Sequence, residues 1–182
     1  MDREALLRVI AMHPHENTPR LEYADWLMQY GSCDRDAATS EFIRMSCSVG
    51  CRQKRMPYEV YGWLIKNWHR LVPKSLAVGV PVESGPTPQQ GWRINWHNGR
   101  KKEVLIRLAR LPPKRGGYRP FKVVFDFAFG FLDRCETWSP VSFGQLKQPL
   151  LADQPLCKVM CHGTTRHPQR VRSLLGGAGA DL

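Results

Sequence analysis

Long apolar runs are missing from this sequence of 182 residues, and their absence limits where the chain can reside. No stretch approaches the ~20 consecutive apolar residues that a membrane-spanning helix needs. The first apolar segment, from Leu6 to Met12, is broken by Arg8 and ends at His13, so it does not have the pattern of a secretory signal. We therefore expect no membrane association and a cytoplasmic location.

Signature motifs of the common enzyme classes are also missing. The chain has no H-E-x-x-H, no P-loop, no G-x-S-x-G elbow and no glycine run of the dinucleotide-binding type. No Ser, Cys or His stands at a spacing that would complete a catalytic triad. The sequence thus favours a binding protein without a cofactor over an enzyme. The alternative is a hydrolase or a metal-dependent enzyme, which zinc bound by the cysteines would support.

Acidic residues are scarce in the middle of the chain. Between Trp92 and Lys122 ten Lys/Arg stand against one acid, Glu103, whereas residues 1–45 carry eight acids and five arginines. A basic segment interleaved with tryptophans suits phosphate contacts and base stacking. The candidate nucleic-acid-binding residues are Arg93, His97, Arg100, Lys101, Lys102, Arg107, Arg110, Lys114, Arg115 and Arg119. The alternative is that Trp92 and Trp96 face the core, while the basic residues only keep the surface soluble.

Cysteine, by contrast, is plentiful, with six residues in a chain for which we expect a reducing compartment and free thiols. Cys47, Cys51, Cys157 and Cys161 form two C-x-x-x-C pairs, a spacing that a structural zinc site tolerates. The alternative is that Cys157, Val159 and Cys161 lie on the core face of one strand as small apolar residues. We favour this second interpretation, because spacing alone supports zinc.

Four helices are predicted in the first part of the chain, from apolar residues at helical spacing. They cover residues 2–12, 19–30, about 40–49 and 57–71, with a polar loop at 31–38. Thr18 is the expected N-cap of the second helix, and Pro19 its first residue. The first two helices, joined by a short connector, should pack antiparallel. In the second helix the expected apolar stripe comprises Leu21, Ala24, Leu27 and Met28.

The first 45 residues resemble the bacterial repeat-companion domain, a short helical module commonly found ahead of leucine-rich repeats. The resemblance rests on Glu4-Ala5-Leu6-Leu7, Pro19-Arg20-Leu21, Tyr23-Ala24-Asp25-Trp26-Leu27, Gly31 and Ser40-Glu41-Phe42-Ile43-Arg44. It implies an architecture and no established enzymatic activity. The structural signature is Arg20, Tyr23, Asp25, Trp26, Phe42 and Arg44. We expect Asp25 to be buried and paired with Arg20 or Arg44, rather than to act as a catalytic acid.

The second part of the chain changes to strand periodicity. Residues 92–97 and 104–108 should form a hairpin about Asn98-Gly99, and one strand should run from Val123 through Phe131. A helix at about 142–151 and a strand at 156–161 follow. This last unit, with a period of 25 residues, has a weaker resemblance to the entry of a leucine-rich repeat.

These patterns predict an α+β protein in four parts. A helical repeat-companion module covers residues 1–77, a Pro/Gly-rich linker or loop 78–91, a mainly antiparallel β-rich region 92–162, and a flexible tail 163–182. The region 92–162 should end in a single β-α-β unit. The first functional hypothesis is a non-enzymatic module that binds a protein partner at an unpaired strand edge over Leu156–Cys161. The alternative is a basic DNA- or RNA-binding protein that uses the 92–122 segment.

Overall fold

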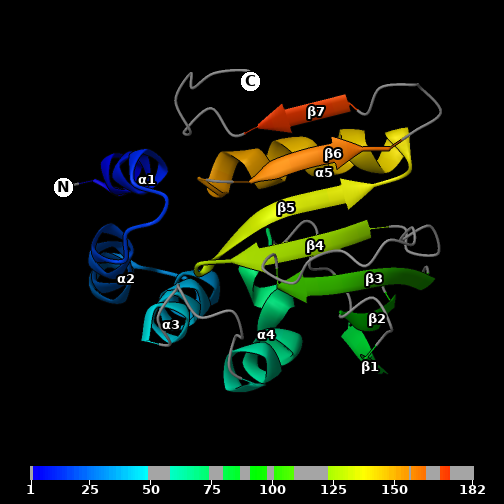
Figure 1. Ribbon diagram of the computed structural model, residues 1–182, viewed down its shortest axis with the longest axis horizontal. Coiled ribbons are helices and arrows are strands. Elements are labelled where there is room, and N and C mark those ends of the chain that lie inside the picture. The colour runs from blue at the N-terminus through cyan, green and yellow to red at the C-terminus, as the bar shows by residue number, and fades with distance from the viewer. Residues whose placement is uncertain are drawn as a thin grey trace.

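The computed structural model describes residues 2–48, 58–73, 80–86, 91–97, 101–108, 123–155, 157–162 and 169–172, and these ranges form helices and one sheet (Figure 1). The helices are α1 (Arg3–Met12), α2 (Thr18–Tyr30), α3 (Asp34–Ser48), α4 (Tyr58–Leu71) and α5 (Pro140–Asp153). The strands are β1 (Val80–Pro86), β2 (Trp92–His97), β3 (Lys101–Leu108), β4 (Val123–Ala128), β5 (Phe131–Thr137), β6 (Lys158–Cys161) and β7 (Gln169–Arg172). The predicted α+β class is confirmed.

The strands form one seven-stranded sheet in sequence order, β1-β2-β3-β4-β5-β6-β7. Neighbours pair antiparallel except at β3–β4 and β5–β6, where they are parallel. The sheet is therefore mainly antiparallel, as predicted. The parallel pair β5–β6 is joined through α5 and forms the predicted β-α-β unit, since a parallel pair needs a crossover connection.

Three expectations about the strands are wrong. Residues 80–86, predicted as part of a linker, form β1, an edge strand that tolerates its two prolines because one side needs no hydrogen bonds. Residues 169–172, predicted as part of a flexible tail, form β7. Because β7 pairs with β6, the segment Leu156–Cys161 does not present the unpaired edge on which protein binding was predicted.

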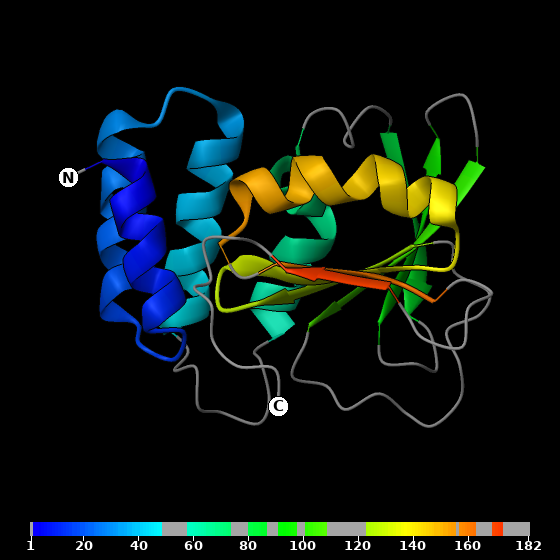
Figure 2. The same ribbon diagram turned by 90° about the horizontal axis from the view of Figure 1, so that it is seen from above.

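Helices α4 and α5 both cover one face of the sheet, while α1, α2 and α3 stand together beyond one end of it (Figure 2). The main core lies between α4, α5 and this first face, and includes Trp68, Phe125, Phe127 and Leu150. The Gln154 side chain, which follows α5, links β5 to α4. It accepts a hydrogen bond from the Leu132 N–H at 3.2 Å and donates one to the Leu71 carbonyl at 3.5 Å. The helices α1–α3 bury a second core against Phe131 of β5.

The first two helices agree closely with prediction, except for the N-cap of the second. Asp2 caps α1 through a hydrogen bond from the Ala5 N–H, at 2.7 Å. Thr18, the predicted N-cap of α2, is its first helical residue, and Asn17 holds the cap position. Helix α3 begins at Asp34, inside the predicted polar loop. Asp34 and Asp36 in the first turn favour this earlier start. Ser40, predicted near the helix start, lies inside α3 instead, where its buried hydroxyl donates to the Ala24 carbonyl of α2 at 2.8 Å.

The apolar stripe predicted for α2 is only half correct. Ala24 and Leu27 are buried, together with Tyr23, but Leu21 and Met28 are 36% and 68% exposed. The helix contacts α1 and α3 on adjacent sides. Its buried surface is therefore set by two neighbours and does not follow a single stripe.

The long strand predicted from Val123 through Phe131 is in fact two strands with a turn between them. Phe129 and Gly130 take positive φ angles of 54° and 87°, so the chain reverses after Ala128. Glycine is needed at the second position, since a Cβ there would lie 2.6 Å from the Ile43 Cα of α3. The turn thus fits closely against the helical module.

Candidate functional site

The second face of the sheet, defined here as the face turned away from α4 and α5, carries most of the strand cations. Cross-strand partners lie on the same face, and the registers give one continuous row across five strands: Arg107, Asp126, Arg134, Lys158 and Arg172. A neighbouring row contains Arg93 and Arg170, and Lys101 lies opposite His97. Of the eight Lys and Arg residues in the described strands, seven thus belong to the second face by register, as do the acids Glu103, Asp126 and Glu136. A further carboxylate, that of Asp133, interacts with Lys158 and Arg134.

The predicted nucleic-acid-binding residues are only partly brought together. Arg93, His97, Lys101 and Arg107 share the second face, whereas Lys102 pairs with Trp96 and belongs to the first. The other five predicted residues lie outside the described ranges: Arg100, Arg110, Lys114, Arg115 and Arg119. Of the two tryptophans, Trp92 packs against the main core beside buried Ile94, as the alternative interpretation predicts.

Three charged side chains and His162 form a polar network at the centre of the second face. Asp126 in β4 is completely buried, and Arg134 donates from Nε to its Oδ2 at 2.9 Å. The Arg134 Nη1 lies 3.3 Å from Glu136 Oε1, and His162 Nε2 lies 3.3 Å from Glu136 Oε2. A buried carboxylate is costly unless it is paired and hydrogen-bonded. The network therefore positions these side chains, with Arg134 engaged by two acids.

An aromatic pair lies at the end of this network. The Trp138 and His162 rings stack with centroids 5.2 Å apart and planes inclined by 24°. Trp138 also packs against Leu105 and Val124, which form a small core cluster on the second face. His162 follows β6 directly, and its backbone N–H donates to the Thr137 carbonyl at 2.8 Å. The β5–β6 pairing thus places both rings.

Among the second-face cations whose side chains the structure describes, Arg93 in β2 and Lys158 in β6 are exposed. Lys158 lies close to Asp133, the extra residue at the β4–β5 irregularity between Asp126 and Phe127. Burial raises the pKa of the Asp133 carboxyl, while Lys158 and Arg134 act to lower it. Within the described side chains of this face, a ligand could reach these two cations and the Trp138–His162 pair.

The zinc candidates are not gathered at one place. Cys157 and Cys161 are buried with Val159 in the main core, as the favoured interpretation predicts, whereas Cys47 lies in the core of the helical module. Cys51 is outside the described ranges. Within the part of the chain that the structure describes, no three His, Cys, Asp or Glu residues form a group that could hold a metal ion. Burial raises the pKa of the Cys135 and Cys157 thiols, which lowers their reactivity.

The signature residues serve packing and pairing between helices. Asp25 forms the predicted ion pair with Arg44, but at 68% side-chain exposure it is not the buried acid that we expected. Arg20 is buried and donates to the Pro14 and Glu16 carbonyls, with its guanidinium 4.9 Å from the Phe129 ring centroid. The remaining contacts are aromatic stacks of Tyr23 on Trp26 and Phe131, and of Phe42 on Trp63.

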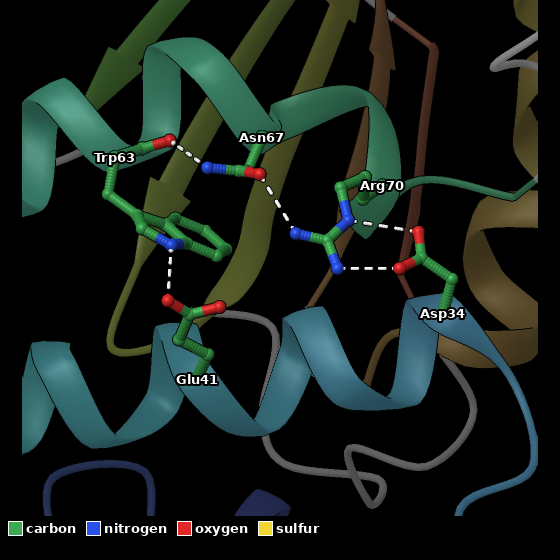
Figure 3. A network of polar contacts seen from close by, with 5 residues as sticks. All are labelled: Asp34, Glu41, Trp63, Asn67 and Arg70. Atoms are coloured by element: carbon green, nitrogen blue, oxygen red, sulfur yellow. Dashed lines mark hydrogen bonds and ion pairs between the residues drawn. The ribbon is translucent and has the colours of Figure 1, made fainter.

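A polar network joins α3 to α4 (Figure 3). Arg70 donates to both carboxylate oxygens of Asp34, at 2.9 and 2.6 Å, and to Asn67 Oδ1 at 2.9 Å. Trp63 Nε1 donates to Glu41 Oε1 at 2.7 Å, and the Trp63 carbonyl accepts from Asn67 at 2.9 Å. These groups satisfy one another, so the network is structural.

Several residues of the second face were not predicted. They are Arg134, Glu136, Trp138, Lys158, His162, Arg170 and Arg172. The alternation of Arg170 and Arg172 about Val171 is a strand signal, but four residues in a segment predicted as a flexible tail were too few to identify β7. Trp138 and His162 lie 24 residues apart, and only the β5–β6 pairing brings them together.

Comparisons with protein-family models, with curated proteins and with solved structures gave no match to this chain. The resemblance to the repeat-companion domain therefore remains a prediction. Among the described residues, no helix is long and apolar enough to cross a membrane. A function must be argued from the geometry of the second face.

Proposed function

We propose that the protein is a non-enzymatic binding protein that holds nucleic acid on the second face of its sheet. The observation that carries the proposal is the register row Arg107–Asp126–Arg134–Lys158–Arg172, which places four basic positions and one acidic position on one face. Of these, Arg134 is held by Asp126 and Glu136 inside the protein. Adjacent strands lie about 4.8 Å apart, so the row spans roughly 19 Å. Cations at this spacing suit a polyphosphate backbone, whose affinity comes from charge neutralisation.

Asp126 and Glu136, two acids of this face, are already engaged inside the protein. Asp126 and Glu136 both contact Arg134, and Glu136 also contacts His162. They therefore oppose the exposed cations less than free carboxylates would.

The protein-partner hypothesis has less support than it had from the sequence, because β7 covers the edge of β6. We further propose a cytoplasmic location. The free thiols of Cys33, Cys47, Cys135, Cys157 and Cys161 fit a reducing compartment.

The proposal is tested with Arg93→Glu/Lys158→Glu, which reverses two exposed cations of the second face. Affinity for a fluorescein-labelled oligonucleotide is measured by anisotropy over a range of salt concentrations. We expect weaker binding at every salt concentration. The slope of log affinity against log salt should become shallower by about 1.4, since each lost phosphate contact removes ~0.7 for a single strand.

A matched control is Arg8→Glu/Lys66→Glu, which makes the same change in charge at exposed positions of α1 and α4. This control should retain most of the affinity and the original salt slope. Equal losses in the two double variants would mean that net charge alone attracts the oligonucleotide. That result, or binding that ignores salt, contradicts the proposal.

A further inference from the structure

The Trp138–His162 pair gives the second face a stacking surface beside its cations. Trp138 packs against Leu105 and Val124, and the His162 ring stacks on Trp138 at 5.2 Å. The His162 side chain is 31% exposed. A planar group that binds this face therefore has an aromatic surface on which to lie.

The His162 ring is held in place before any ligand binds. Its backbone is fixed by the hydrogen bond to the Thr137 carbonyl, its ring stacks on Trp138, and its Nε2 lies 3.3 Å from Glu136 Oε2. Glu136 is in turn held by Arg134, which contacts buried Asp126. A ring positioned in this way loses little conformational entropy when a base stacks on it.

The cations lie where they could contact phosphates of neighbouring nucleotides in a strand that has one base stacked on His162. Lys158 and Met160 of β6 both lie on the second face, and His162 is the next residue along the chain on that face. Arg170 of β7 is the register partner of Met160. At about 3.3 Å per residue, Lys158 is roughly 13 Å from His162 along the strand. Charge and aromatic surface thus occupy the same part of the sheet.

Resting on the proposed function, we infer that the ligand is single-stranded nucleic acid and that one of its bases stacks on the ring of His162. Duplex DNA is commonly read by an α-helix or a two-stranded ribbon in the major groove. Helices α4 and α5 both lie on the other face, and α1–α3 stand beyond the end of the sheet (Figure 2). A sheet face with basic and aromatic residues instead suits unpaired bases.

The test compares three fluorescein-labelled probes of equal length, about 12 nucleotides, which is within the range that one single-strand-binding domain covers. They are oligothymidylate, an abasic strand with the same number of phosphates, and a mixed-sequence duplex. The wild-type protein should bind oligothymidylate roughly tenfold more tightly than the abasic strand, because stacking of one base contributes a factor of this order. The duplex should bind more weakly than oligothymidylate.

Two variants locate the stacking. His162→Ala should lose the preference for oligothymidylate and leave affinity for the abasic strand within about twofold, whereas His162→Phe should keep the preference because it retains a ring. Far-UV circular dichroism checks that both variants fold. If the wild type binds intact and abasic strands equally, or the duplex more tightly, this inference is overturned and the proposed function stands. If it binds none of the probes, the proposed function fails as well.

Discussion

Two neighbouring aspartates of the sheet differ in how their burial is compensated. Asp126 is completely buried but hydrogen-bonded to Arg134 at 2.9 Å. Asp133 is set apart by the irregular register between β4 and β5, and burial raises its pKa despite the nearby Lys158 and Arg134. For Asp133, desolvation thus outweighs the attraction of both cations.

We predict that Asp133→Asn makes the protein more stable at neutral pH. A raised carboxyl pKa means that the folded state releases its proton at a higher pH than the unfolded chain. The free energy of unfolding of the wild type therefore falls as the pH rises from about 4 through the raised pKa. The substituted amide does not titrate, so the advantage of the variant should grow over this pH range and then level off. Urea denaturation at several pH values measures it.

A difference between Asp133→Asn and the wild type that is constant with pH, or that shrinks as the pH rises, would contradict this prediction. Oligonucleotide binding offers a second readout at the same residue. Because Lys158 lies close to Asp133, removal of the carboxylate should strengthen binding at neutral pH.

At the scale of elements, the contacts between α3 and α4 link the predicted repeat-companion segment to the helix that covers the sheet. Phe42 of α3 stacks on Trp63 of α4, and Asp34 of α3 accepts a hydrogen bond from Arg70 of α4. The Arg70 side chain is 27% exposed and donates two parallel hydrogen bonds to Asp34. Asp34 is 66% exposed, so it is the bidentate geometry that makes this pair stabilise more than an ordinary surface pair does.

We therefore predict a coupling energy of about 1 kcal/mol between Asp34 and Arg70. It is measured by urea denaturation of Asp34→Asn, Arg70→Gln and the double variant. The control cycle uses Glu4 and Arg8 in α1, whose side chains are 63% and 64% exposed. That pair should couple by only about 0.4 kcal/mol, the usual figure for an exposed pair at this helical spacing. Equal coupling in the two cycles would contradict the structural role given to Arg70.

At the scale of the whole molecule, two cores meet at the turn between β4 and β5. Phe131 belongs to the core of α1–α3, whereas Phe127, just before the turn, belongs to the core under α4 and α5. Arg20 covers Phe129 between them. The predicted division into a helical module and a β-rich region therefore cuts through shared packing, and we expect the two to unfold together.

The substitution Gly130→Ala tests whether the two cores unfold together. An added Cβ would lie 2.6 Å from Ile43 Cα, at a φ of 87° that side chains disfavour, so we expect a loss of about 3 kcal/mol. Gly62→Ala in α4 is the control, because a Cβ there meets nothing within 4 Å and alanine should stabilise the helix by up to about 1 kcal/mol. Circular dichroism at helical wavelengths and tryptophan fluorescence should report one transition in each variant. Two separate transitions would mean that the cores unfold independently.

Local patterns were enough to predict the α+β class, the helices α1, α2, α4 and α5, and the core positions of Cys157, Val159 and Cys161. Turn positions were harder, since nothing local marks Phe129 and Gly130 as the end of a strand that alternates so regularly. Most residues of the candidate site could not be predicted from local patterns. Of the ten basic residues proposed from composition, four share the second face, and Lys158, Trp138 and His162 were missed because they lie in separate segments.

The sequence by itself determined which segments are helical or extended and where positive charge concentrates, because spacing, capping and composition act within a few residues. Only the tertiary structure decided which face each strand residue occupies and that β7 covers β6, since register depends on pairing between distant segments. It also decided that Asp126 is buried beside Arg134 and that Trp138 stacks on His162. These long-range contacts turn a basic composition into a face with its cations in a row.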